Sequence, residues 1–271
     1  MANAVRNALI AAGLALACAG CPARAQSVIE ASYTIAVARI PVGAASMTAR
    51  IGPGEYVISM SGRTGGLLRV LARGEGVMTA TGAVVDGRLS PSRYTSRTTA
   101  DDDTLDVTMA FQDGNVKELE ASPPPEADRV PVAEEHRLHV VDPLSALAIP
   151  IGSSGMSAAA CEHTLAIFDG RRRYDLKLAF KRMVEVKADK GYAGSAVECS
   201  VAFQPIAGHR PASPLLKLLT SSRAVEMTFA PVAGATVLAP FRFAVTNLLG
   251  DITVQASRFE ATPSQPAGQA Q

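Results

Sequence analysis

Apolar and polar residues alternate with a period of two along most of this chain. Successive side chains of a β-strand point to opposite faces, so the alternation predicts strands with one buried face and one face in water. The repeat of 3.6 residues that marks amphipathic helices is rare. The alternating segments are residues 29–37, 56–60, 105–111, 174–180, 197–203, 225–229, 241–245 and 252–256.

Asp-Gly pairs stand between several of these segments. Asp86-Gly87, Asp113-Gly114 and Asp169-Gly170 each separate two alternating runs, and Asp-Gly favours the positive φ angles of a two-residue hairpin turn. The whole pattern predicts about a dozen antiparallel strands, more than a flat open sheet usually carries. We therefore expect an all-β fold, a strongly curved antiparallel sheet or an incomplete β-barrel with one or two short helices.

The short helices are expected at residues 142–147 and 213–219. Each begins with a capping residue, Asp142 or Ser213, and proline follows at the first helical position. Residues 121–135 contain three consecutive prolines and many acidic residues, a composition that predicts a long solvated loop.

The N-terminus has the features of a secretory signal over residues 1–25. Arg6 supplies the positive charge, residues 9–20 are small and apolar, and Ala23-Arg24-Ala25 fits the cleavage pattern. The mature chain would begin at Gln26, and we expect it in the periplasm.

A lipid anchor at Cys21 is the alternative, because small residues precede this cysteine. Cys18 stands where leucine is usual, so the anchor is less favoured. The apolar run is shorter than the roughly 20 residues that span a bilayer, and no transmembrane segment is expected in the mature chain. That chain is predicted to be one β-rich domain over 26–261 with a disordered tail over 262–271.

Composition argues against a disordered protein and against a nucleic-acid-binding protein. The chain has 271 residues, of which 48% are hydrophobic, and this fraction is ample for a packed core. It carries 26 Lys and Arg against 25 Asp and Glu, so we expect no nucleic-acid partner, which would require a basic excess.

Two cysteines, Cys161 and Cys199, remain after signal cleavage. In an oxidising compartment this pair predicts a disulfide.

Candidate catalytic chemistry is sparse. His136 and His139, with Glu134, Glu135 and Asp142 nearby, contain enough nitrogen and oxygen ligands for a divalent metal. A spacing of three residues on a strand would point the two imidazoles to opposite faces, however. Neither a His-Glu-x-x-His nor a Gly-x-Ser-x-Gly motif is present. We therefore predict no metal, no cofactor and no enzymatic activity.

The segment around Asp169-Gly170 is predicted to form a hairpin. A two-residue turn there would place Leu165 opposite Tyr174, with the apolar pairs on one side. The three arginines beside this turn are Arg171, Arg172 and Arg173. They are candidate contacts for a phosphate, a lipid headgroup or a partner protein, and pairing with nearby aspartates and solvent is the alternative.

The same segment carries a family resemblance. The run from Cys161 to Leu176, with Asp-Gly-Arg-Arg-Arg-Tyr-Asp-Leu at its end, resembles an exported proteobacterial family known as domain of unknown function 3108. Residues 141–145, the Tyr33 strand with Gly43 beyond it, and Cys199 followed by residues 205–208 fit the same family. The resemblance implies a β-rich periplasmic protein and supplies no catalytic residues.

A curved sheet with many inward aliphatic residues and 5% aromatic residues has an interior that its own side chains need not fill. We therefore predict a non-catalytic periplasmic protein that binds a lipid-like or other hydrophobic ligand on the concave face of its sheet. The predicted inward positions are Tyr33, Ile35, Val37, Leu105, Val107, Met109, Leu176, Leu178, Phe180, Val201, Phe203, Phe241 and Phe243. The alternative is a cell-envelope scaffold or assembly partner that binds another protein.

Overall fold

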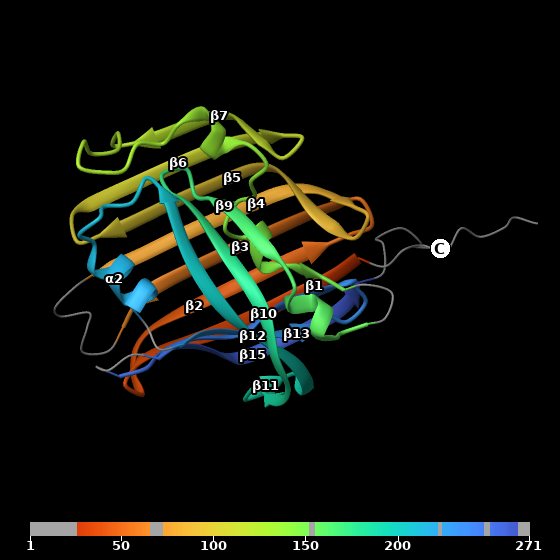
Figure 1. Ribbon diagram of the computed structural model, residues 1–271. Coiled ribbons are helices and arrows are strands. Elements are labelled where there is room, and N and C mark those ends of the chain that lie inside the picture. The colour runs from red at the N-terminus through yellow and green to blue at the C-terminus, as the bar shows by residue number, and fades with distance from the viewer. Residues whose placement is uncertain (1–25, 66–72, 152–154, 222–223, 247–249, 265–271) are drawn as a thin grey trace, which may run out of the picture.

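The structure is a computed structural model that describes residues 26–65, 73–151, 155–221, 224–246 and 250–264 (Figure 1). The signal-peptide prediction for residues 1–25, with Cys18 and Cys21, lies outside these residues. Fifteen described strands form one sheet, in which β1 and β15 are neighbours and β7 and β9 are the two ends. The hydrogen-bonded order is β7-β6-β5-β4-β3-β2-β1-β15-β14-β13-β12-β10-β9, with β11 paired to β15 and β8 to β14.

The first seven strands form an antiparallel meander in which each strand pairs with the next. The φ angles are +51° at Asp86 and +75° at Gly87, and +52° at Asp113 and +73° at Gly114. Both predicted hairpin turns are therefore confirmed. The strands are β1 (Gln26–Val37), β2 (Ile40–Ile51), β3 (Glu55–Thr64), β4 (Gly74–Val85), β5 (Arg88–Ala100), β6 (Asp103–Gln112) and β7 (Asn115–Ser122).

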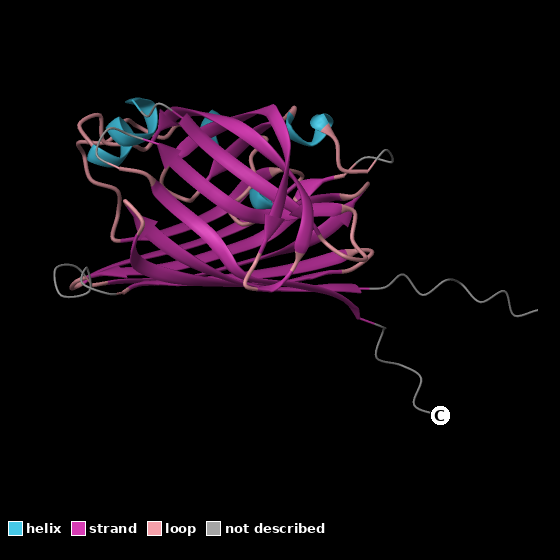
Figure 2. Ribbon diagram, turned by 90° about the horizontal axis from the view of Figure 1, so that it is seen from below, coloured by secondary structure: helices cyan, strands magenta, loops and turns pink. Residues whose placement is uncertain are grey.

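The second half of the chain adds strands beyond β1. The strands are β8 (Ile149–Pro150), β9 (Thr164–Phe168), β10 (Arg173–Lys187), β11 (Lys190–Gly191), β12 (Ala193–Ala207), β13 (Ala224–Pro231), β14 (Val237–Thr246) and β15 (Ile252–Ser264). In Figure 1, β1 to β7 form a broad wall, and β9, β10 and β12 cross in front of it. Figure 2, turned by 90°, shows how strongly the strands curve. The predicted fold class, a strongly curved and unclosed antiparallel sheet, is confirmed.

The gap between the sheet ends β7 and β9 is bridged by a connecting segment. Val140 N donates to Gly114 O over 2.8 Å, on the β7 side, and Val141 N donates to Ala166 O of β9 over 2.9 Å. Val130 N likewise donates to His209 O over 3.0 Å. Within the predicted loop over 121–135, most residues are exposed, but residues 121–122 belong to β7 and residues 134–135 to η1.

Four short helices are described. The helix predicted at 142–147 is confirmed as a 3-10 turn, and the one at 213–219 as an α-helix. The helices are η1 (Glu134–Arg137), η2 (Ser145–Leu147), η3 (Ala158–Cys161) and α2 (Pro214–Ser221).

Asp142 fixes the start of η2 from a fully buried position. Its Oδ1 accepts hydrogen bonds from Leu144 N and Ser145 N over 2.9 and 3.0 Å, and its Oδ2 accepts from Ser145 Oγ over 2.5 Å. The Ser145 hydroxyl also lies 2.6 Å from the Tyr56 hydroxyl of β3. These hydrogen bonds therefore join η2 to the β1–β7 wall.

The concave face of the sheet is filled by its own side chains. Phe241 and Phe259 are both 1% exposed, and their ring centroids lie 5.6 Å apart. A cavity in this core, lined by Ile29, Met47 and Ile58 among others, measures about 10 Å³, which leaves room for at most one water molecule. In this core, side chains of the protein therefore occupy the space on the concave face where the ligand was predicted.

The predicted disulfide between Cys161 and Cys199 is confirmed. A second apolar cluster surrounds it. The Cα atoms of Cys161 and Cys199 are 5.5 Å apart, and both side chains are 0% exposed. Leu178, Phe229 and Leu238 pack in the same cluster. The bridge links η3 to β12 and so fastens the segment between β8 and β9 onto the sheet.

A β-bulge in β14 decides which of its residues share a face. Phe229 pairs with Pro240 but Thr228 pairs with Arg242, so Phe241 is an extra residue in β14. An extra residue reverses which alternate positions point to each face. Phe241 therefore joins the large core, whereas Phe243 packs with the disulfide cluster. The prediction that both phenylalanines share one concave face is wrong for this reason.

The last strand is longer than predicted. β15 runs to Ser264, which pairs with Gln26 of β1. Residues 262–264, assigned above to a disordered tail, therefore form strand, and residues 265–271 lie outside the described part. Within the described residues, no helix has the length and apolar character needed to cross a membrane.

Candidate ligand pocket beneath α2

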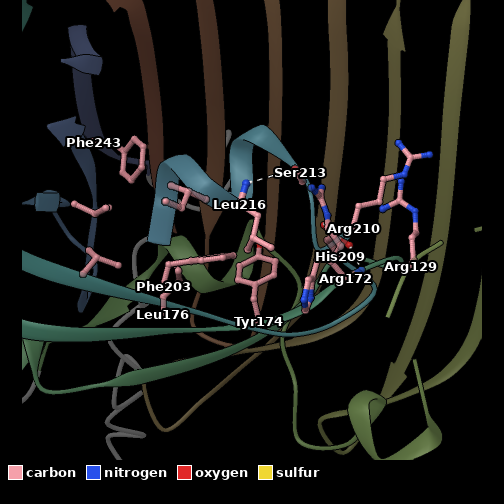
Figure 3. Close-up of a pocket in the computed structure, with 14 residues that line it drawn as sticks. Arg129, Arg172, Tyr174, Leu176, Phe203, His209, Arg210, Ser213, Leu216 and Phe243 are labelled. Carbon is pink, nitrogen blue, oxygen red and sulfur yellow. Dashed lines mark hydrogen bonds and ion pairs between the residues drawn. The ribbon is translucent and has the colours of Figure 1, made fainter. Parts of the chain in front are cut away.

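A cavity of about 400 Å³ lies between α2 and the ends of β10, β12, β13 and β14 (Figure 3). Its lining combines leucine, valine and aromatic side chains with three arginines. The lining residues are Arg129, Asp169, Arg172, Tyr174, Leu176, Val201, Phe203, His209, Arg210, Ser213, Leu216, Leu219, Val225 and Phe243.

The apolar part of the pocket follows from strand register. Leu176 of β10 lies opposite Phe203 of β12, and the ring of Phe203 packs 5.4 Å from that of Tyr174. These positions alternate with solvent-facing residues, as the period-two pattern predicts. On α2, Leu216 and Leu219 are three residues apart and so lie on the same helix face.

The polar end of the pocket is held by ion pairs. Arg210 contacts Glu126 over 2.8 Å and Asp128 over 3.0 Å, and Arg129 also pairs with Glu126. The hydrogen bond from Arg129 lowers the pKa of Glu126 to about 2. Arg172 Nε donates to Asp169 Oδ2 over 2.8 Å. The arginines therefore come from three separate segments that meet at this end.

The turn that carries Arg172 differs from the prediction. Phe168 pairs with Arg173, and Leu165 pairs with Leu176, so the turn contains four residues rather than two. Asp169 Oδ1 accepts hydrogen bonds from the backbone nitrogens of Arg171 and Arg172 over 2.9 and 2.6 Å. This side-chain bonding stabilises the wider turn, and the predicted pairing of Leu165 with Tyr174 is wrong.

The three consecutive arginines do not form one cationic surface. Arg171 is 8% exposed and donates to Pro123 O, while Arg173 donates to Asp175 Oδ1. Of the three, Arg172 is the residue that lines the pocket. Arg129 and Arg210, which join it there, were not among the predicted site residues, because both lie in connecting segments without a local pattern.

Comparison with known proteins identifies the family. A family model described as "Protein of unknown function (DUF3108)" matches residues 32–257. The chain belongs to the DUF3108 family. A crystal structure of a beta-barrel-like protein of domain of unknown function DUF1849 from Brucella abortus is similar at a TM-score of 0.48 and 10% sequence identity, over 89% of this chain and 98% of that chain. A search of curated proteins gave no significant match.

The residues that carry the DUF3108 resemblance have structural roles. Cys161 and Cys199 form the disulfide, Asp142 accepts the backbone hydrogen bonds of the turn that leads into η2, and Asp169 organises the turn before β10. Gly208 has a φ of +75°, and a Cβ there would lie 1.8 Å from Arg171 O. Glycine is therefore required where this segment passes the turn.

The predicted lining residues separate into three groups. Leu176, Val201, Phe203 and Phe243 line the pocket. Leu105 and Phe180 are 38% and 40% exposed. Val37 is also exposed and Ile35 is half-buried. The remaining residues are buried in the two packed clusters, and these are Tyr33, Val107, Met109, Leu178 and Phe241.

The two histidines considered as metal ligands, His136 and His139, are part of local hydrogen-bonded structure. His136 Nδ1 accepts a hydrogen bond from Ala133 N over 3.0 Å, and His139 has a positive φ of 53° beside Asn115. The described residues contain no cluster of three or more histidine, cysteine or acidic side chains suited to a metal ion.

Proposed function

We propose that this protein is a non-catalytic binding protein that holds a hydrophobic, lipid-like ligand in the pocket beneath α2. The observation that carries the proposal is a cavity of about 400 Å³ whose walls include Leu176, Phe203, Leu216 and Phe243. Ligand sites in proteins measure about 300 to 1,000 Å³ and are mostly apolar. The sequence predicted the ligand on the concave face of the sheet, whereas this pocket lies between α2 and the ends of β10, β12, β13 and β14.

Burial of apolar surface supports occupancy by a hydrophobic molecule. Transfer of apolar surface out of water is favourable by roughly 25 cal/mol per Å². Leu216, Leu219 and Phe203 are only half-buried in the empty pocket, so a ligand that covers them gains this free energy. Water in the same pocket would not provide this favourable free energy, because the apolar surface would stay hydrated.

Two polar side chains of the pocket, Asp169 and Ser213, have partners that support a structural role in a binding site. Asp169 accepts hydrogen bonds from two backbone nitrogens and pairs with Arg172. Ser213 Oγ accepts from Leu216 N at the start of α2, over 3.4 Å. Both oxygens are thus engaged in holding the walls of the pocket. We place the protein in the periplasm because its buried disulfide is typical of oxidising compartments.

Leu216→Asp is expected to abolish binding of a fluorescent fatty acid that the wild-type protein binds saturably. The substitution puts a charge on the pocket face of α2, where an apolar ligand would have to desolvate it. Leu138→Asp is the matched control, because Leu138 is 47% exposed and does not line the pocket. Fluorescence titration, with circular dichroism to verify folding, measures both variants.

Native mass spectrometry of protein purified from its own host provides an independent readout. A retained mass that Leu216→Asp loses and Leu138→Asp keeps would support the pocket. Absence of saturable binding in the wild-type protein would overturn the proposal and favour the alternative role as an envelope scaffold.

A further inference from the structure

The pocket beneath α2 has two chemically different ends. Figure 3 shows Phe243, Phe203 and Leu176 toward one end, and Arg129 and Arg210 toward the other. A purely apolar ligand would use only the first end. The second end indicates that the ligand carries a group that guanidinium cations recognise.

Three arginines and one carboxylate line this end of the pocket. The arginines are Arg129, Arg172 and Arg210, and the carboxylate is Asp169, which pairs with Arg172. The other acidic partners, Glu126 and Asp128, have side chains that are 49% and 63% exposed and do not line the pocket. These two acids pair with Arg129 and Arg210 from the solvent side and balance part of their charge.

Hydrogen-bond donors remain for a ligand. A guanidinium has five N–H groups, and Arg172 uses its Nε to contact Asp169. Within the described part of the chain, neither Nη group of Arg172 is recorded with a hydrogen-bond partner or ion pair. Bidentate contact to a carboxylate or a phosphate is the arrangement for which this planar group is suited.

Two further polar groups lie beside the arginines. His209 Nδ1 is buried and has no hydrogen-bond partner among the described residues. A buried polar atom of this kind costs free energy unless a partner satisfies it. Burial also raises the pKa of the Tyr174 hydroxyl, which therefore stays protonated and able to donate. Both residues line the cavity.

We propose that the ligand is an anionic amphiphile, with one hydrophobic chain and a carboxylate or phosphate headgroup. The chain lies against Leu176, Phe203 and Phe243, and the headgroup contacts Arg172 and Arg210. This inference rests on the proposed function, since it names the class of ligand for the same pocket. The headgroup adds to the existing ion pairs, because each arginine retains N–H groups beyond those that its acid partners use.

Titration calorimetry with matched ligands tests the inference. Laurate and dodecyl phosphate share their chain with uncharged dodecanol, and inorganic phosphate supplies the headgroup alone. We expect laurate or dodecyl phosphate to bind at least about tenfold more tightly than dodecanol, because one charge-assisted hydrogen bond contributes about that factor in affinity. Binding of the charged ligand should weaken as salt is added.

Arginine variants locate the headgroup. Arg172→Gln and Arg210→Gln should each weaken binding of the anionic ligand about tenfold more than they weaken binding of dodecanol. Arg97→Gln is the matched control, because it removes an arginine from a surface ion pair with Asp106 that lies outside this pocket.

The outcomes separate this inference from the proposed function. Equal binding of dodecanol and laurate, unaffected by the arginine variants, would overturn the anionic headgroup and leave a hydrophobic pocket. Binding of inorganic phosphate alone, with no gain from the chain, would overturn the amphiphile. Failure of all four ligands to bind would overturn both proposals. Preference for dodecyl phosphate over laurate, or the reverse, identifies the headgroup.

Discussion

Replacing Cys161 and Cys199 together with alanine is expected to lower the free energy of unfolding by roughly 3 to 4 kcal/mol. The bridge closes a loop with a sequence separation of 38, so its removal restores conformational freedom mainly to the unfolded chain. Both side chains are fully buried in the second apolar cluster. Denaturant unfolding of the variant and the wild-type protein measures the difference.

Reduced wild-type protein is the control for this prediction. It lacks the covalent bond but keeps both sulfur atoms, so it separates loop closure from loss of packing. We expect most of the destabilisation to appear on reduction alone. An unchanged unfolding midpoint after complete reduction, verified by thiol counting, would show that the bridge contributes nothing to stability.

Asp142→Ala is expected to cost about 2 to 4 kcal/mol, because three buried hydrogen-bond donors in the turn that leads into η2 lose their acceptor. The wild-type carboxylate accepts from two backbone N–H groups and from Ser145 Oγ. The Asp142 side chain is 0% exposed, so its loss leaves these donors inside the protein. Thermal or denaturant unfolding of the variant measures the loss.

Asp142→Asn is the matched variant. Burial raises the pKa of the Asp142 carboxyl, which shows that the ionised form is penalised in the folded protein. Asparagine keeps one acceptor oxygen without the charge. We expect it to retain most of the stability that alanine loses at neutral pH. Equal destabilisation by both substitutions would contradict the role assigned to Asp142.

Local chemistry made part of the fold predictable. Asp86-Gly87 and Asp113-Gly114 specify their turns because the required positive φ angles suit these residue types. Asp142 and Ser213, each followed by proline, mark the starts of short helices for a similar reason. Cys161 and Cys199 were predictable because an even pair in an oxidising compartment has one intramolecular pairing available.

The candidate site was less predictable, because tertiary structure decides it. The bulge at Phe241 leaves no mark in the alternation of apolar residues, yet it sends Phe241 and Phe243 to opposite faces. The four-residue turn at Asp169 depends on side-chain bonding that an Asp-Gly pair does not distinguish from a tighter turn. Arg129 and Arg210 reach the pocket from segments that only the folded chain brings together.

The pairing of β1 with β15 has a consequence for the order of folding. Gln26 lies opposite Ser264, so this pairing requires almost the whole chain, whereas β2 to β7 pair only with sequence neighbours. Closing a long loop costs more entropy than closing a hairpin, and contacts between distant residues form late. A partly synthesised or partly refolded chain therefore leaves one edge of β1 unpaired, where it is exposed to other chains. Pulse-labelled hydrogen exchange during refolding should protect amides of β3 to β6 before those of β15, and simultaneous protection would contradict this order.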